Sequence, residues 1–121
     1  RLVRTLCPLC KELDEEADPE LLAEAVRPWK VNKGSYRPFR AVGCVECRMS
    51  GYKGRLGLYE LLTVSHAFRK LIMADADLAD LRRQAARDGM RPLRLGGAQL
   101  VGEGLTTLQE VVATTPPLDA D

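Results

Sequence analysis

The chain has 121 residues, of which 45% are hydrophobic and 5% aromatic, and its formal net charge is +1. This length fits one domain or two small lobes that share an interface. The sequence contains no run of eighteen apolar residues and no signal peptide, so we expect neither a membrane-spanning helix nor a secreted protein. Because it opens on Arg1 without an initiator Met, we expect it to be part of a longer protein.

Charges are unevenly distributed along the first half of the chain. Seven acids accompany one base between Lys11 and Glu24, and we interpret this acidic run as a solvated face. Between residues 27 and 55 a single acid, Glu46, accompanies eight bases, which are Arg27, Lys30, Lys33, Arg37, Arg40, Arg48, Lys53 and Arg55. Such a basic run suits an anionic partner: a phosphate group, a lipid surface or an acidic protein patch.

Residues 2–6 are typical of a short strand or a helix end that leads into a cysteine turn. A short helix is then predicted to begin at Asp18, which can cap exposed N–H groups, with Pro19 at the first helical position. Pro28 ends this helix, and we interpret Trp29 as a packing residue that helps to cover the first lobe.

The four cysteines form two matched pairs, Cys7-Pro-Leu-Cys10 and Cys44-Val-Glu-Cys47, with 33 residues between them. Each pair lies on one tight turn, and two such turns brought together supply four thiolates for one tetrahedral metal ion. Soft sulfur ligands in a closed set favour Zn²⁺, with iron as the main competitor. The sequence therefore predicts a structural zinc site whose ligands are Cys7, Cys10, Cys44 and Cys47.

Two other uses of these cysteines are weaker. Two disulfides would suit a secreted chain, but 18 Lys and Arg, 17 Asp and Glu and the lack of a leader indicate a reducing compartment. A Cys-x-x-Cys redox pair seldom occurs twice at this distance. The single histidine, His66, lies outside both pairs, and we interpret it as a surface or packing residue.

The segment from Tyr36 to Val42 alternates loosely and contains Pro38, which predicts an edge strand leading to Cys44. Residues 50–62 contain glycines at 51, 54 and 57 and predict a strand or hairpin arm. On this arm Leu56 and Leu58 would share one face while Tyr59 points away.

The hydrophobic period changes to the helical value in the second half of the chain. Four short helices are predicted: one capped by Ser65, one capped by Asp77 with Leu78, Leu81 and Ala85 facing inward, one starting at Pro92, and one with the capping box Thr106-x-x-Gln109. Gly97 falls in the apolar stripe of the third helix, where it would let a neighbouring helix approach closely. Short helices of this kind must pack as a bundle or against a partner.

The predicted fold class is therefore α+β, with a small tetracysteine zinc lobe of short strands followed by a C-terminal bundle of short helices. We expect a zinc-binding subdomain over residues 1–62, a helical subdomain over 63–116 and a disordered tail over 117–121.

Catalytic motifs are missing from the sequence. It contains no Gly-x-x-x-x-Gly-Lys-Ser/Thr phosphate loop, no Gly-x-Gly-x-x-Gly motif and no serine in a nucleophile elbow. We therefore expect this chain, taken alone, not to turn over a substrate.

Several motifs together resemble one protein family. They are the opening Arg1–Cys10 segment, the Gly43-Cys44-x-x-Cys47 turn, the Gly51–Leu62 segment, Gly89–Arg94 and Gly104–Val111. In this order they resemble the C-terminal end of the ATPases that power type II secretion and type IV pilus assembly. The metal-ligand role in that family falls on the same four cysteines.

The resemblance implies a parent protein that is a hexameric cytoplasmic ATPase docked on the inner membrane. Its ATP and Mg²⁺ sites would lie upstream of this chain, and its partners would be the upstream ATPase core, neighbouring hexamer subunits and the inner-membrane secretion or pilus platform proteins. A type II secretion motor and a pilus motor share these motifs, so both stay open. No role transfers to the basic insert from Trp29 to Arg40.

Three alternatives for the basic residues stay open. The first is a zinc-ribbon nucleic-acid-binding module, which we do not expect because aromatic residues are few and not spaced as a stacking platform. The second places Lys53 and Arg55 against a neighbouring subunit or its nucleotide phosphates, against a plainer reading as solvated or ion-paired surface charges. The third is contact with anionic lipid.

Overall fold

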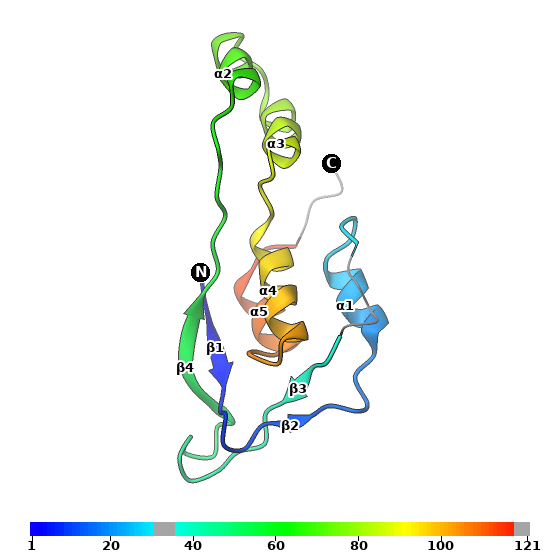
Figure 1. Cartoon of the computed structure of the whole chain (residues 1–121), viewed down its shortest axis with the longest axis vertical. Coiled ribbons are helices and arrows are strands. Elements are labelled where there is room, and N and C mark those ends of the chain that lie inside the picture. The colour runs from blue at the N-terminus through cyan, green and yellow to red at the C-terminus, as the bar shows by residue number, and fades with distance from the viewer. Residues whose placement is uncertain (31–35, 118–121) are drawn as a thin grey trace. The chain divides into compact units, whose positions relative to one another are not determined.

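The structure, a computed structural model, describes residues 1–30 and 36–117 (Figure 1). Its elements in chain order are β1 (Leu2–Leu6), β2 (Glu12–Leu13), α1 (Pro19–Ala25), β3 (Phe39–Arg40), β4 (Tyr52–Gly57), α2 (His66–Met73), α3 (Leu78–Arg87), α4 (Leu93–Gly102) and α5 (Leu108–Thr114). Their contacts divide the chain into two compact units. We call residues 1–59 with the described residues from 93 onward the tetracysteine unit, and residues 60–92 the helix-pair unit.

An antiparallel ribbon of β1 and β4 forms the centre of the tetracysteine unit (Figure 1). Val3 lies opposite Leu56 and Arg4 opposite Arg55, and the register shifts between Arg4 and Leu6. The other edge of β1 is also paired, because Leu6 N–H donates to the Leu105 carbonyl at 2.9 Å. Strand β1 is therefore fixed on both sides, and it delivers Cys7 to the first turn from a rigid position.

Helices α4 and α5 cover the buried face of this ribbon. The core consists of Val3, Leu58, Val101 and Val111, all 4% exposed or less. A Cβ on Gly97 would lie 2.5 Å from Val111 Cγ1, so the predicted close approach of a second helix at Gly97 is confirmed. As predicted, Leu56 and Leu58 face this core, while Tyr59 is 83% exposed.

Helix α1 begins as the sequence predicts. The Asp18 side chain accepts a hydrogen bond from Glu20 N–H, and Pro19 occupies the first turn. Leu22 and Val26 form a second small core with Ala98 of α4. Helix α1 therefore belongs to the tetracysteine unit through apolar contacts.

The edge strand predicted over Tyr36–Val42 is much shorter than expected. Only Phe39 and Arg40 have strand structure, and they pair with β2, which the sequence analysis did not identify. Pro38 lies just before β3 and cannot donate a ladder hydrogen bond, which limits the strand. Residues 31–35 of the predicted basic insert lie outside the described residues.

The helix-pair unit contains α2 and α3, whose predicted caps are confirmed. The Ser65 side chain accepts from Phe68 N–H and the Asp77 side chain from Asp80 N–H. Phe68 and Ala85 are buried, whereas Leu78, predicted to face inward, is 60% exposed. Leu78 is the first residue of α3, where the partner helix does not cover it.

The predicted capping box at the start of the last helix is wrong by one residue. Thr107, not Thr106, caps α5, because its side chain accepts from Glu110 N–H. The fully buried Thr106 instead donates its hydroxyl to the Arg4 carbonyl at 2.7 Å. Of the two adjacent threonines, Thr106 therefore bonds to β1 and Thr107 caps α5.

The predicted α+β class is confirmed by short antiparallel strands, a tetracysteine cluster and five short helices. The four C-terminal helices pack as two pairs, α2 with α3 and α4 with α5. The subdomain boundaries at 1–62 and 63–116 stay a prediction, and residues 118–121 of the predicted tail lie outside the described residues. Within the described ranges, no helix has the length and apolar content needed to cross a bilayer.

Candidate metal centre

The first cysteine turn follows β1 directly. Cys7 N–H donates to the Gly51 carbonyl at 2.9 Å, which ties the end of β1 to the second cysteine turn. Lys11 N–H donates to the Cys7 carbonyl at 3.0 Å and closes the turn that carries Cys10. Lys11 is held in place as well, since its Nζ donates to the Gly104 carbonyl at 2.9 Å. The first turn is therefore connected to both the second cysteine turn and the loop before α5.

The second cysteine turn depends on two glycines with positive φ. Gly43 has φ of +111°, and a Cβ there would lie 2.8 Å from the Met49 carbonyl oxygen. Gly51 has φ of +83°, and its Cβ would lie 2.6 Å from Ala41 Cβ. Met49 N–H donates to the Cys44 carbonyl at 2.8 Å across the turn. Both ends of this turn thus require glycine, for backbone conformation and for space.

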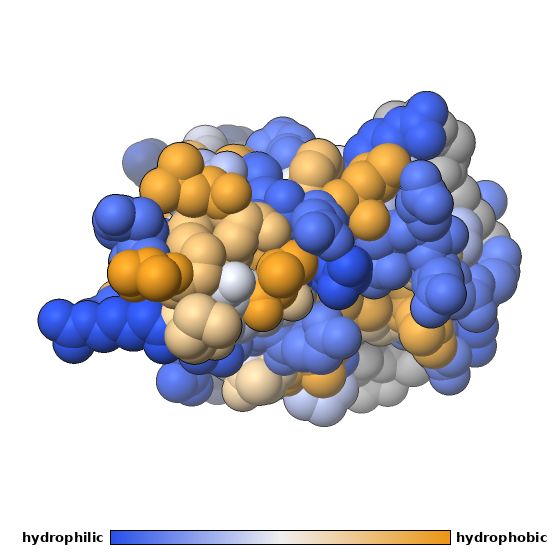
Figure 2. Space-filling model, turned by 90° about the horizontal axis from the view of Figure 1, so that it is seen from below, coloured by the Kyte–Doolittle hydropathy of each residue, from blue (hydrophilic) through white to orange (hydrophobic). Residues whose placement is uncertain are grey.

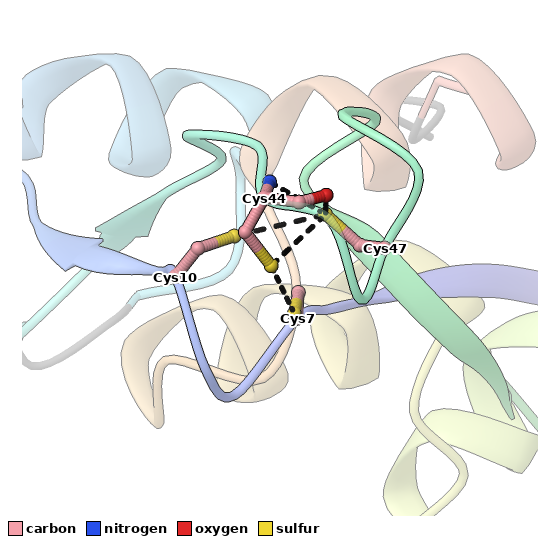
Figure 3. A group of neighbouring side chains, drawn as sticks. All are labelled: Cys7, Cys10, Cys44 and Cys47. Atoms are coloured by element: carbon pink, nitrogen blue, oxygen red, sulfur yellow. Dashed lines mark hydrogen bonds between the residues drawn. The ribbon is translucent and has the colours of Figure 1, made fainter.

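The two turns bring all four sulfur atoms together (Figure 3). Every pair of Sγ atoms lies within 4.8 Å. The Sγ–Sγ distance is 3.8 Å for Cys7 and Cys44, 3.8 Å for Cys10 and Cys47, and 3.7 Å for Cys44 and Cys47. Cys7 and Cys47 are buried, and Cys10 and Cys44 are half-buried.

These distances fit a metal ion and not a disulfide. All four cysteines are free, and a disulfide would need an S–S distance of about 2.05 Å. A tetrahedral Zn²⁺ with Zn–S bonds of about 2.3 Å requires sulfur atoms about 3.8 Å apart. The donor set therefore has the chemistry and the size for a tetrathiolate metal ion.

Backbone amides are aimed at two of the sulfur atoms. Cys44 N–H and Gly51 N–H both donate to Cys47 Sγ at 3.2 Å, and Gly43 N–H donates to Cys10 Sγ at 3.3 Å. Burial raises the pKa of the Cys47 thiol, but the two N–H donors, together with hydrogen bonds from the Cys44 and Cys10 thiols, outweigh it and lower this pKa to about 6. These donors favour a thiolate, the form that binds metal.

The pKa of the Cys10 thiol is shifted in the opposite direction. Burial raises its pKa to about 11, and the hydrogen bond from Gly43 N–H only partly opposes this effect. Hydrogen bonds between the Cys10 thiol and the sulfur atoms of Cys47, Cys7 and Cys44 add to the rise, because they favour the protonated form. Four ionised thiols at this spacing need a compensating cation, and a divalent metal ion supplies it.

The other residues singled out from the sequence have ordinary surroundings. His66 is the exposed first residue of α2. Lys53 Nζ lies 3.7 Å from Glu46 Oε2 with both side chains exposed, which is the plainer of the two predicted readings for Lys53. Arg55 is exposed on β4. Trp29 is half-buried after α1.

Sequence analysis missed the amide donors and several residues that hold the turns in place. Gly43 and Gly51 flank the second pair, and their position next to cysteines is the one signal that indicated them. Arg4 gave no signal: its guanidinium lies 4.1 Å from the Tyr52 ring centroid and donates to Glu110 Oε2 at 2.9 Å. These contacts link β1, β4 and α5 behind the cysteine turns.

Comparison with known proteins gives the family. The family described as "Type II/IV secretion system protein" matches residues 1–113. The "Type IV pilus assembly ATPase PilB" of Myxococcus xanthus is 39% identical over 118 residues, which are 97% of this chain and 20% of that protein. The "Type II secretion system protein E" of Pseudomonas aeruginosa is 37% identical over 115 residues, which are 95% of this chain and 22% of that protein.

The "Type IV pilus assembly ATPase PilB" of Thermus thermophilus is also 37% identical over 115 residues, which are 13% of its length. The chain thus spans about a fifth or less of these relatives, between 13% and 22%. The family match covers nearly the whole chain, including both cysteine turns, helices α1 to α4 and all but the last residue of α5. This chain belongs to the family of type II and type IV secretion system proteins.

Proposed function

We propose that Cys7, Cys10, Cys44 and Cys47 bind one structural Zn²⁺ and that this chain is a metal-stabilised C-terminal module of a hexameric ATPase. The parent would power type II protein secretion or type IV pilus assembly, with ATP and Mg²⁺ bound upstream. The observation that carries the proposal is the set of four free cysteines whose Sγ atoms all lie within 4.8 Å of one another. When bound, Zn²⁺ supplies four coordinate bonds that join the two turns.

The surrounding residues explain why this lobe would need a metal. Around the turns the buried side chains are few: Leu6, Cys7 and Cys47, each 6% exposed or less. So small an apolar cluster cannot by itself fix two loops. Apparent zinc-binding free energies of about 10–16 kcal/mol in small fingers are large enough to do so. The role we assign to the site is therefore to hold shape, with no open coordination position for water.

Removal of the metal tests this role. Chelation of the purified protein is expected to abolish the near-ultraviolet dichroism of the tetracysteine unit and to lower its thermal midpoint. Cys47→Ser should produce the same change without chelator, whereas Val45→Ala, which alters the 87% exposed neighbour in the same turn, should leave the midpoint unchanged. A chelated protein with its dichroism and midpoint intact would remove the structural role.

In the parent protein we place the module on the cytoplasmic side of the inner membrane, in contact with its own ATPase core, neighbouring subunits and the platform proteins. Support for this context comes from the relatives whose printed names are pilus assembly ATPase and type II secretion system protein. Genetic complementation tests it. Zinc-site variants of the complete protein should fail to restore secretion or piliation in a strain that lacks the gene, and the lost phenotype identifies the motor type.

The alternative function, a nucleic-acid-binding zinc ribbon, has less support. Stacking on bases needs exposed aromatic faces. The Tyr52 ring is covered by the Arg4 guanidinium, and its hydroxyl lies 2.8 Å from Thr107 Oγ1. The Phe39 ring lies 4.9 Å from Lys11 Nζ. The aromatic rings nearest the basic residues are thus occupied within the fold, and a gel-shift assay at low salt should show no complex.

A further inference from the structure

Large apolar side chains are exposed at the tips of both cysteine turns. Leu9 is 69% exposed in the first turn, and Val45 and Met49 are 87% and 69% exposed in the second. The two turns form the lower end of the tetracysteine unit in Figure 1, and Figure 2, seen from below, shows apolar side chains gathered toward one end of this face. A group of exposed apolar side chains at one place on a surface marks a site that contacts a protein or a membrane.

The backbone of both turns is fixed, so the side chains of Leu9, Val45 and Met49 cannot move into the interior. Each turn is closed by a backbone hydrogen bond, from Lys11 N–H to the Cys7 carbonyl and from Met49 N–H to the Cys44 carbonyl. The sulfur atoms of both turns point toward one another on the inner side (Figure 3). Leu9, Val45 and Met49 are the large apolar residues among the exposed residues of the two turns. The turns therefore present three apolar side chains at fixed positions.

The surroundings of the tips are basic. In residues 7–11 and 43–55, which carry the two turns, four bases stand against one acid, Glu46; the bases are Lys11, Arg48, Lys53 and Arg55. Glu46 has a basic neighbour, because its Oε2 lies 3.7 Å from Lys53 Nζ. Four thiolates with one divalent cation would add a charge of −2, which leaves this region positive. The surface is thus complementary to an anionic partner.

We propose that the two cysteine turns dock on an anionic lipid bilayer, with Leu9, Val45 and Met49 inserted at the boundary between headgroups and acyl chains. Exposed Arg48 and Lys53, next to the tips, would lie at the level of the lipid phosphates. The proposal rests on the proposed metal site, because the metal holds the turns side by side.

Three apolar residues on two protruding turns suit a bilayer better than a protein. A specific protein interface buries about 800 Å² on each partner and usually contains a continuous apolar centre. An interfacial membrane contact needs only a few apolar side chains that enter about 5–10 Å, together with basic residues at the headgroups. The tips with their flanking bases have the second pattern.

Vesicle flotation of the complete, zinc-loaded protein tests the proposal. Vesicles of phosphatidylglycerol and phosphatidylcholine should bind the protein, and vesicles of phosphatidylcholine alone should bind it much less. The triple variant Leu9→Ser, Val45→Ser, Met49→Ser should lose binding by more than about tenfold, since each buried methylene is worth about a fourfold change in partitioning. Added salt should weaken binding by the parent protein.

A matched control removes the same number of exposed apolar residues elsewhere. Leu61, Met73 and Leu78 are 79%, 88% and 60% exposed in the helix-pair unit. Their triple serine variant should bind anionic vesicles as the parent protein does. Equal losses in the two triple variants would mean general stickiness and would overturn the proposal.

A depth measurement adds a readout that folding defects do not imitate. In Val45→Trp the new indole should be quenched by lipids brominated on their acyl chains, whereas in Met73→Trp it should not; the native Trp29 contributes equally to both. No vesicle binding by a protein that contains one zinc per chain refutes the lipid contact and leaves the metal site intact. Absence of zinc refutes the metal site first. Tip-dependent binding to detergent-solubilised platform protein but not to vesicles would assign the surface to a protein partner instead.

Discussion

Addition of one methyl group at two adjacent positions of α4 tests the packing that supports the cysteine turns. A Cβ on Gly97 would lie 2.5 Å from Val111 Cγ1, 2.9 Å from Val111 Cγ2 and 3.3 Å from Leu58 Cδ1. A Cβ on Gly96 would meet nothing within 4 Å. Both substitutions therefore make the same change in helix propensity, but only Gly97→Ala introduces a steric clash.

The magnitudes follow from this difference. Alanine is favoured over glycine inside a helix by about 1 kcal/mol, so Gly96→Ala should stabilise the protein by up to that amount. Overpacking a closed core costs about 1–3 kcal/mol, and Val111 has no exposed surface through which it can relax. Gly97→Ala should therefore be less stable than Gly96→Ala by about 1–3 kcal/mol.

Urea unfolding of the zinc-loaded protein measures the unfolding free energy of both variants. In a separate thermal unfolding experiment, their midpoints should differ by about 3–6 °C for each kcal/mol, for a chain of this size. The second substitution Val111→Ala removes both clashing methyl groups. In that background the difference between the Gly96 and Gly97 variants should shrink. Equal stabilisation by Gly96→Ala and Gly97→Ala would refute the close contact between α4 and α5.

Three further perturbations test other parts of the structure. Arg94 is 8% exposed and donates to the carbonyls of Thr115 and Val112 at the end of α5. Arg94→Met should lower the unfolding free energy in urea by about 2–4 kcal/mol, because it leaves these acceptors unpaired. A loss below about 1 kcal/mol would contradict that role. The hydrogen bond from Arg4 lowers the pKa of Glu110 against the effect of burial. The stabilisation from this ion pair is present above the unfolded-state pKa of about 4.3 and is lost as the pH falls through the lower folded-state pKa. The difference in unfolding free energy between the parent protein and Glu110→Gln should therefore be constant from pH 8 to pH 6 and close below about pH 4. A gap that does not depend on pH would exclude this ion pair. Cys7→Ser should lower zinc content and disorder the lobe from residue 6 to 58, and amide exchange in that lobe at the rate of the parent protein would contradict the prediction.

The elements that sequence analysis predicted correctly depend on short-range interactions. The cap bonds of Asp18, Ser65 and Asp77 join residues two or three positions apart, so a short window of sequence contains both partners. The face shared by Leu56 and Leu58 also follows from local alternation, and for residues 2–6 the strand alternative is the one that the structure shows. The Cys-x-x-Cys spacing is equally local, and it indicated a cluster that the folded chain brings within 4.8 Å.

The errors arose where a distant residue decides the outcome. Thr106 and Thr107 are equivalent as local capping residues, and a bond from Thr106 to the Arg4 carbonyl, 102 positions away, decides between them. The β2 strand pairs with β3 through Glu12 and Arg40, 28 residues apart, and two-residue strands leave no periodic signal. The positive φ of Arg48 and Met49 next to Cys47 had no glycine to indicate it.

The coordination of metal by the purified protein tests the central claim most directly. Elemental analysis combined with X-ray absorption at the zinc edge should give one zinc per chain, with four sulfur neighbours at about 2.3 Å and no nitrogen neighbour. A protein without metal, with iron in place of zinc, or with its cysteines joined as disulfides in mass spectra would contradict the account.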